Sequence, residues 1–227
     1  ADANFVVSRS LVAEPGTYTP EFGHETWPKD SDAWMRGGAN IWQTPAVDPQ
    51  LGLLYFSTAN PGPDLNGSVR EGDNLFANSI VAIDAKTGQY RWHFQQVRHD
   101  IWDYDSPNPV ILFDAPYDGR MRKALVQVGK TGWAYILDRE TGRPLLGIED
   151  RAVPQEPRQK TAATQPYPVG DAIVPQQIDI APEGANLDPA TLRLFNDGRI
   201  FTPFWTTPIS VKPGTMGGAN WPPSAYD

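Results

Sequence analysis

The fold is indicated most clearly by one stretch, Ser79-Ile80-Val81-Ala82-Ile83-Asp84-Ala85-Lys86-Thr87-Gly88-Gln89-Tyr90-Arg91-Trp92-His93-Phe94. Its two ends are rich in β-branched and aromatic residues, which are typical of strands, and its middle is a short polar turn. Gly88 suits a turn position that needs a positive φ angle. The carboxylate of Asp84 can accept backbone N–H groups across the turn. The stretch therefore predicts a β-hairpin.

The same pattern occurs a second time further along the chain. Trp133-Ala134-Tyr135-Ile136-Leu137-Asp138 is followed by Arg139-Glu140-Thr141-Gly142 and by the short run Arg143-Pro144-Leu145-Leu146. Both copies consist of an apolar strand, Asp, two residues, Thr-Gly and a second strand. Repeats of about 40–50 residues made of short strands are typical of β-propeller blades. Two such hairpins would also fit a β-sandwich.

The composition agrees with an all-β chain of many short strands. The 227 residues include 23 Pro, 20 Gly and eight Trp. A helix of one or two turns is expected only at 188–195, where Asp188 would be the N-cap and Pro189 the first helical residue. The region of about 150–200 is rich in Pro, Gln and Ala and predicts a long excursion between blades. No domain linker is evident, so we expect a single all-β domain over residues 1–227.

Several classes of function are disfavoured by what the sequence contains. A net charge of −8 makes nucleic acid and anionic membranes poor candidates as partners, and no apolar run approaches the length of a membrane helix. The chain has no Cys, which excludes disulfides and thiolate metal sites. Nucleotide-binding glycine motifs and the Gly-x-Ser-x-Gly motif are absent. His24, His93 and His99 lack metal-site spacing, so a structural role is expected for each.

An acidic, aromatic cluster is the strongest candidate for chemistry: His99-Asp100-Ile101-Trp102-Asp103-Tyr104-Asp105. In an extended segment, residues 103 and 105 point to the same side. Two carboxylates on one side suit a hard cation, or one can bind the cation while the other acts as a base. A solvated loop with buried aromatic residues is the alternative, and composition alone favours it.

Six motifs occur in a fixed order along the chain. They are Gly37-Gly38-Ala39-Asn40-Ile41-Trp42, Ser57-Thr58-Ala59-Asn60-Pro61-Gly62-Pro63, Arg70-Glu71-Gly72-Asp73-Asn74, the hairpin at 79–92, the cluster at 99–105 and Gly217-Gly218-Ala219-Asn220-Trp221. Together they resemble the methanol and ethanol family of pyrroloquinoline-quinone (PQQ)-dependent dehydrogenases. The resemblance covers almost the whole chain and is weakest at 150–200. It implies an eight-bladed β-propeller, of which this chain would hold about three or four blades.

The resemblance implies roles for individual residues in binding PQQ and in catalysis. Trp42 would stack on the flat PQQ ring system, which requires a wide aromatic face. Asp103 would be the catalytic carboxylate that takes the proton from the substrate hydroxyl. Lys130 would hydrogen-bond the quinone carbonyl oxygens and stabilise the negative charge that grows as hydride arrives. Further contacts to the cofactor would come from Asn220 and from Trp221.

The resemblance also implies a metal site. Asn60 would bind the metal through its side-chain oxygen, together with Asp103. In calcium-dependent relatives the position two residues after the catalytic Asp is usually small and uncharged, whereas in lanthanide-dependent relatives it is Asp, an additional ligand. Asp105 occupies this position, which favours a lanthanide ion over Ca²⁺, because a trivalent ion prefers more negative charge and more oxygen ligands. A hydrogen-bonded structural Asp remains the alternative.

The chain also departs from the family. The family's glutamate metal ligand would lie before residue 1, and the chain lacks both the adjacent Cys pair that covers one face of PQQ and a haem domain. We therefore expect an internal segment that is inactive alone. Further blades, from missing sequence or from another chain, would complete the propeller.

The activity implied for the parent protein is the oxidation of an alcohol to an aldehyde or ketone by hydride transfer to PQQ. Electrons would then pass to a cytochrome c or to a haem domain. The resemblance places such an enzyme in the bacterial periplasm. The alternative is a non-catalytic propeller that serves as a binding scaffold and lacks convergent metal and quinone ligands.

Overall fold

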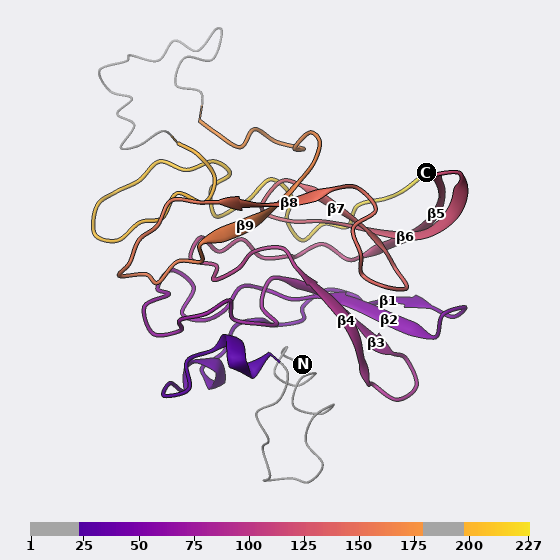
Figure 1. The fold of residues 1–227 in the computed structure, drawn as a ribbon, viewed down its shortest axis with the longest axis horizontal. Helices are drawn as coiled ribbons and strands as arrows, with labels where there is room; N and C mark the ends of the chain where they lie inside the picture. Colours follow the sequence, from indigo (N-terminus) through magenta and orange to yellow (C-terminus); the bar gives the residue numbers. More distant parts are fainter. Residues whose placement is uncertain (1–22, 179–197) are drawn as a thin grey trace, which may run out of the picture.

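The computed structural model describes residues 23–178 and 198–227. Nearly all regular structure in these residues is β-strand (Figure 1). Two single-turn 3-10 helices, η1 (His24–Thr26) and η2 (Ala33–Met35), lie near the beginning. In the described part of the chain, no helix is both long and apolar enough to cross a membrane. The all-β class is confirmed, and the helix expected at 188–195 lies outside the described residues.

The first sheet is a four-stranded antiparallel meander. Its strands β1 (Ala46–Asp48), β2 (Leu53–Ser57), β3 (Ser79–Asp84) and β4 (Tyr90–Gln95) are neighbours in chain order. This confirms the hairpin predicted from residues 79–94. Asp84 Oδ1 accepts the N–H groups of Lys86 and Thr87 at 3.0 and 2.9 Å, as expected for its turn. A four-stranded antiparallel sheet is the architecture of a propeller blade.

The second sheet contains β5 (Ile111–Tyr117), β6 (Arg120–Val128) and β7 (Ala134–Asp138), again in chain order. Asp138 repeats the turn of the first sheet, because its Oδ1 accepts two backbone N–H groups at 3.1 and 3.0 Å. The prediction of a regular strand at 143–146 is wrong. This run forms only an isolated bridge between Leu137 and Pro144. Pro144 has no N–H group to continue a ladder.

A two-stranded ribbon lies within the region of about 150–200 that was predicted as an inter-blade excursion. Its strands are β8 (Ile148–Ala152) and β9 (Thr164–Pro168). Gln159 and Gln165 are both buried. Their side-chain oxygens accept the N–H groups of Gly67 and Arg98 at 2.8 and 2.9 Å. The ribbon is therefore anchored to loops of the first sheet.

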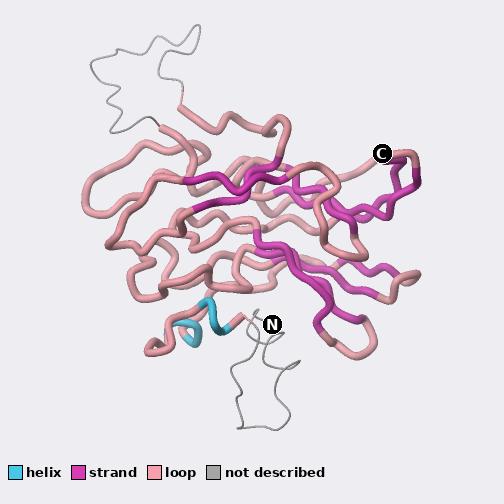
Figure 2. The backbone as a smooth tube through the Cα atoms, in the orientation of Figure 1, coloured by secondary structure: helices cyan, strands magenta, loops and turns pink. Residues whose placement is uncertain are grey.

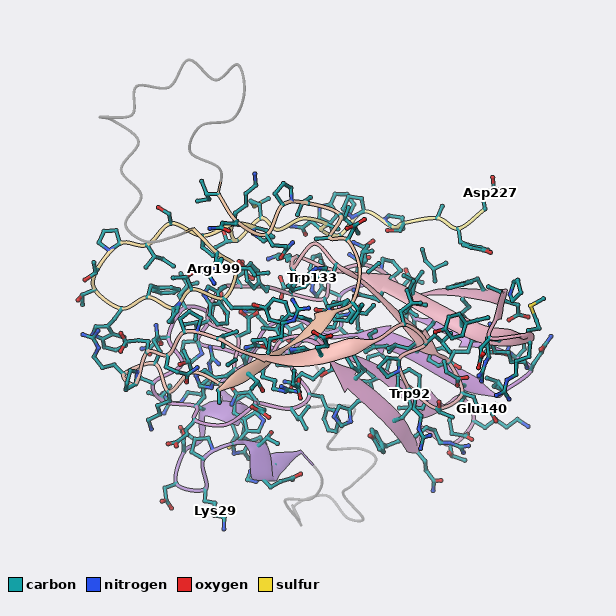
Figure 3. The ribbon with its side chains drawn as sticks, turned by 45° about the horizontal axis from the view of Figure 1, so that its top comes forward. Lys29, Trp92, Trp133, Glu140, Arg199 and Asp227 are labelled. Atoms are coloured by element: carbon teal, nitrogen blue, oxygen red, sulfur yellow. The ribbon has the colours of Figure 1, made fainter. Side chains whose placement is uncertain are left out.

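The main core lies between the first and second sheets. Trp92 of β4 and Trp133, both labelled in Figure 3, belong to the same buried cluster. The ring of Trp133 lies 5.0 Å from that of Tyr167 in β9, which brings the ribbon into this core. Arg139 crosses between the sheets, because its Nε lies 2.7 Å from Asp48 Oδ2 at the end of β1. The sheets and the ribbon are thus packed together.

The antiparallel order divides the connections between two ends of the sheets. Successive strands alternate in direction, so the connections at 58–78, 96–110 and 129–133 leave the sheets at one end. Figure 2 shows the strands concentrated in one half of the molecule and long loops in the other. The opposite end carries the short turns that begin with Asp48, Asp84 and Asp138. The long connections contain the residues with candidate functional roles.

Candidate active site

The histidines near the acidic cluster have structural contacts. His99 is buried, and its two ring nitrogens lie 2.8 and 2.7 Å from the carbonyl oxygens of Gly72 and Gln159. His93 Nδ1 lies 2.8 Å from the hydroxyl oxygen of Tyr90, and burial lowers the pKa of His93 to about 4. These contacts confirm the structural role expected for both residues.

Asp103 and Asp105 converge on the ammonium group of Lys130. Lys130 Nζ lies 2.9 Å from Asp103 Oδ1 and 2.7 Å from Asp105 Oδ2. The two carboxylates share one partner although Asp103 is not extended, as the sequence predicted, but left-handed with a φ of 61°. The side chain of Asp103 is 32% exposed, against 9% for Asp105 and 7% for Lys130. Asp103 is therefore the most accessible member of the three.

Asn60 joins the cluster through its backbone. Its N–H group donates to Asp105 Oδ1 at 2.7 Å, so Asp105 uses one oxygen for Asn60 and the other for Lys130. The carbonyl oxygen of Asn60 accepts the N–H group of Ala39 at 2.6 Å. At this crossing only glycine fits at position 38, because a Cβ there would lie 2.2 Å from the backbone nitrogen of Gly62.

Lys130 stands on the turn between β6 and β7, and the segment 217–221 packs against this turn. The N–H group of Gly218 donates to the carbonyl oxygen of Lys130 at 2.9 Å. Gly217 has a φ of 76°, and a Cβ there would lie 2.5 Å from Lys130 Cα. Only glycine allows this close approach. The segment that carries Asn220 is thereby held against this turn, since the N–H group of Ala219 also donates to the carbonyl oxygen of Gly129 at 3.3 Å.

The three residues predicted to contact the cofactor differ in their surroundings: the side chain of Asn220 is hydrogen-bonded, whereas Trp42 and Trp221 are exposed. Asn220 uses its side chain locally: Nδ2 donates to the carbonyl oxygen of Met216 at 3.0 Å, and Oδ1 accepts the N–H group of Trp221 at 2.8 Å. Trp42 and Trp221 are 46% and 59% exposed. The segment before Trp42 is tied to the segment of Asn60, since the N–H of Ala59 donates to the carbonyl oxygen of residue 40 at 3.0 Å. Both indoles therefore present exposed aromatic surface.

The electrostatics of the cluster are set by burial and by the ion pairs. Burial raises the pKa of Asp103 to about 6, against the opposing hydrogen bond from Lys130, and the charge of Asp105 adds to the rise. For Lys130, burial alone would lower the pKa, but the hydrogen bonds and charges of Asp105 and Asp103 outweigh it and the pKa is raised. A carboxylate with a pKa near the working pH is suited to accept a proton from a substrate.

The oxygen atoms at this point suit a hard cation. Carboxylates and amide oxygens are the ligands that Ca²⁺ and trivalent ions prefer. Asp103 and Asp105 bring two carboxylates together, whereas Asn60 contacts Asp105 through its backbone N–H group. The carboxylates already enclose one positive charge, the ammonium of Lys130. Among residues 23–178 and 198–227, no group of three or more His, Cys, Asp or Glu is placed to hold a metal. Asp103 and Asp105 by themselves supply only part of the oxygen ligands that such a cation takes.

Three buried residues hold the acidic loop in place and were given no site role from the sequence: Arg70, Asn78 and Asp100. Asp100 belongs to the acidic cluster, but its position in the sequence does not predict whether its carboxylate is buried or exposed to solvent. Arg70 and Asn78 lie in the long connection between β2 and β3, whose sequence has no strand or helix periodicity. Their contacts with the loop at 99–105 are visible only in the tertiary structure, because they join residues that are far apart in the chain.

Known proteins match the chain over most of its length. Residues 17–227 match the family model described as PQQ: glucose/ethanol/alcohol dehydrogenase, β-propeller domain. The glycerol dehydrogenase large subunit of Gluconobacter thailandicus is 34% identical over 215 residues, covering 88% of this chain and 29% of the relative. The quinoprotein alcohol dehydrogenase PedH of Pseudomonas putida is 31% identical over 227 residues, covering 98% and 33%.

A solved structure of a europium-containing methanol dehydrogenase is similar in fold. Its TM-score is 0.59 at 27% sequence identity, and the match covers 89% of this chain and 30% of that chain. The chain spans about a third of the length of the relatives it matches.

Proposed function

Because the chain belongs to the PQQ-dependent glucose, ethanol and alcohol dehydrogenase β-propeller family, we propose that it forms part of an enzyme that oxidises an alcohol to an aldehyde or ketone. The partial β-propeller expected from the sequence is confirmed by this family and by the fold of its solved relatives. Alcohol oxidation by the complete protein is what we propose beyond this family assignment. One observation supports it most: Asp103, Asp105 and Lys130 meet at the end of the sheets that carries the long connections.

In this proposal, Asp103 is the base that removes the proton from the substrate hydroxyl. It is the most accessible carboxylate of the cluster, and its raised pKa suits proton transfer near neutral pH. The ammonium of Lys130 stabilises negative charge that grows beside it during the reaction. When bound, PQQ supplies the acceptor for the hydride of the alcohol carbon. Trp42 offers the aromatic surface on which the flat ring system stacks.

We propose further that Asn60, Asp103 and Asp105 hold the cation, and that the cation is a lanthanide ion in preference to Ca²⁺. Asp105 is buried beside Asp103 and would add a second negative ligand, which a trivalent ion needs more than a divalent one does. The likeness to a europium-containing enzyme supports this choice. The structural alternative for Asp105 is its pairing with Lys130 and Asn60 alone.

The electron acceptor in this proposal is a cytochrome c or a haem domain. Support comes from relatives named quinohemoprotein alcohol dehydrogenases, such as that of Comamonas testosteroni, which is 38% identical over 121 residues. Further blades from outside residues 1–227 would complete the propeller, and the bacterial periplasm is the proposed location.

Reconstitution of the complete enzyme tests the proposal. With PQQ and either Ca²⁺ or La³⁺, we expect the absorption spectrum of bound quinone and dye-linked oxidation of primary alcohols. The 227-residue chain alone should show no turnover, because it supplies only part of the site. A complete protein that binds no quinone would contradict the proposal and support the scaffold alternative.

A further inference from the structure

The side chain of Asp100 is fully buried and accepts hydrogen bonds on both sides of Asp103. Asp100 Oδ1 accepts the N–H group of Trp102 at 2.8 Å, and Oδ2 accepts the N–H group of Tyr104 at 2.6 Å. These are the two residues that flank Asp103 in the chain. We propose that Asp100 is a positioning residue that holds Asp103 in its reactive place, an inference that rests on the proposed role of Asp103 as the base.

Asp103 needs such support because of its backbone. Its φ of 61° lies in the left-handed region, which is uncommon for residues other than glycine, although Asp and Asn adopt it more readily than most. Positions of this kind are held by contacts with their surroundings and concentrate at functional sites. The hydrogen bonds that Asp100 accepts from the residues before and after Asp103 fix the loop at this position.

Asn78 connects Asp100 to the segment that carries Asn60. Its Nδ2 donates to Asp100 Oδ2 at 2.8 Å and to the carbonyl oxygen of Tyr104 at 2.9 Å. Its backbone N–H donates to the carbonyl oxygen of Ala59, the neighbour of Asn60, at 2.9 Å. The two acceptors around Nδ2 fix the orientation of the amide, because a flipped amide would place oxygen against oxygen. Asn78 thus ties the base loop to the proposed metal segment.

The remaining contacts of the loop also anchor the residues around Asp103. Arg70 is fully buried, and its NH2 group donates to the carbonyl oxygen of Asp100 at 2.5 Å. Trp102 Nε1 donates to the carbonyl oxygen of Thr202 at 2.7 Å. The hydroxyl group of Tyr104 donates to the carbonyl oxygen of Pro213 at 2.5 Å. The residues around Asp103 are therefore anchored on the buried side, while Asp103 itself is 32% exposed.

The chemistry requires a carboxylate at position 100 and not an amide. Asp100 faces three N–H donors, and a carboxylate offers only acceptors. In Asp100→Asn the volume is kept, but the new NH2 group must face at least one of these donors. A buried donor without an acceptor is unfavourable, and the loop is expected to relax away from it.

The test is Asp100→Asn in the complete enzyme, with Asp138→Asn as the matched control. Asp138 also accepts two backbone N–H groups, at 3.1 and 3.0 Å, but in a turn at the far end of the sheets. Per molecule of bound PQQ, we expect kcat to fall roughly 10- to 100-fold in Asp100→Asn, since small displacements of a reacting group are costly. KM for the alcohol should change little, and Asp138→Asn should keep full turnover.

The inference would be overturned if kcat per bound PQQ in Asp100→Asn stayed within twofold of the unchanged enzyme. If the melting temperature fell at the same time, Asp100 would be a structural residue only. Should Asp100→Asn fold poorly, Asn78→Ser removes the amide that holds Asp100 and gives the same readouts. Asp103→Asn is measured in parallel: normal turnover there would refute the base role itself, independently of Asp100.

Discussion

Lys130 Nζ lies 2.7 Å from Asp105 Oδ2 and so joins the turn between β6 and β7 to the loop that follows β4. The contact spans the two sheets and is almost fully buried, at 7% and 9% side-chain exposure. Asp103 adds a second carboxylate to the same ammonium. In this structure the lysine is the positive charge that balances the acidic pair. Its position explains how the two carboxylates can lie close together.

Replacing Asp103, the proposed base, should abolish turnover without preventing PQQ from binding. Asp103→Asn keeps the size and much of the hydrogen bonding of the side chain but cannot accept the substrate proton. We expect the complete enzyme to keep PQQ and to lose roughly 10²- to 10⁴-fold in kcat, the usual contribution of general base catalysis. Bound PQQ is measured by absorbance and turnover by a dye-linked assay. Normal rates would remove Asp103 from the mechanism.

Cation binding should weaken as the pH falls through about 6. Burial raises the pKa of Asp103 to about 6, so below that pH the carboxyl group is mostly protonated. A cation needs the deprotonated form, and protons therefore compete with it. Tb³⁺ luminescence, titrated between pH 7.5 and 5.0, measures the apparent affinity. In Asp103→Asn this part of the pH dependence should be absent; an equally steep dependence would contradict the assignment.

Removing the lysine charge should change affinity and turnover in opposite directions. In Lys130→Gln the acidic pair loses its internal counter-ion, so we expect Tb³⁺ to bind at least about tenfold more tightly. Turnover should fall, because the charge that stabilises the reacting oxygen is gone. Lys160→Gln is the control, since Lys160 pairs with Glu71 at the surface, 3.2 Å apart. Weaker Tb³⁺ binding in Lys130→Gln would show that the lysine does not compete with the cation.

The docking of the segment 217–221 should depend on glycine at position 217. Gly217→Ala places a methyl group 2.5 Å from Lys130 Cα, and we expect lower PQQ occupancy and lower turnover. Gly88→Ala is a matched control, because Gly88 has a φ of 73° but open space around the new Cβ. The control carries the backbone strain without the clash. If both variants lose PQQ to the same extent, the close approach to Lys130 is not what matters.

The buried ion pair between Asp48 and Arg139 should matter for stability. Arg139 Nε lies 2.7 Å from Asp48 Oδ2, and both side chains are nearly inaccessible. Removing one partner of a buried pair typically costs about 3–5 kcal/mol of unfolding free energy when the other charge is left unpaired. Arg139 keeps a second partner, because its Nη1 lies 2.5 Å from Asp114 Oδ1, so the loss should be smaller than that. We expect Asp48→Asn to lower the melting temperature clearly and to leave kcat per bound PQQ unchanged. Asp84→Asn, in an exposed turn, should have little effect; similar losses in both variants would contradict a special role for the pair.

Local patterns in the sequence were sufficient for the class of fold. The hairpin at 79–94 and the Asp turns at 84 and 138 are encoded by residues adjacent in the chain, so their geometry follows from strand propensity and turn chemistry. The pattern failed at 143–146, where apolar residues predicted a strand but Pro144 permits only a bridge. It also gave no strand at 164–168, because β9 contains two prolines and has no regular alternation.

What the sequence alone determined was which ionisable residues are available: acidic residues spaced two apart in the loop at 99–105, and a lysine between glycines at 129–132. The tertiary structure decided which of these side chains meet and which are buried. Asp103, Asp105 and Lys130 come together because alternate connections of two antiparallel sheets leave at the same end. Asp100 is buried because Asn78 donates a hydrogen bond to its carboxylate and Arg70 donates one to its carbonyl oxygen. Contacts between residues far apart in the chain depend on the packing of the sheets, which no local pattern contains.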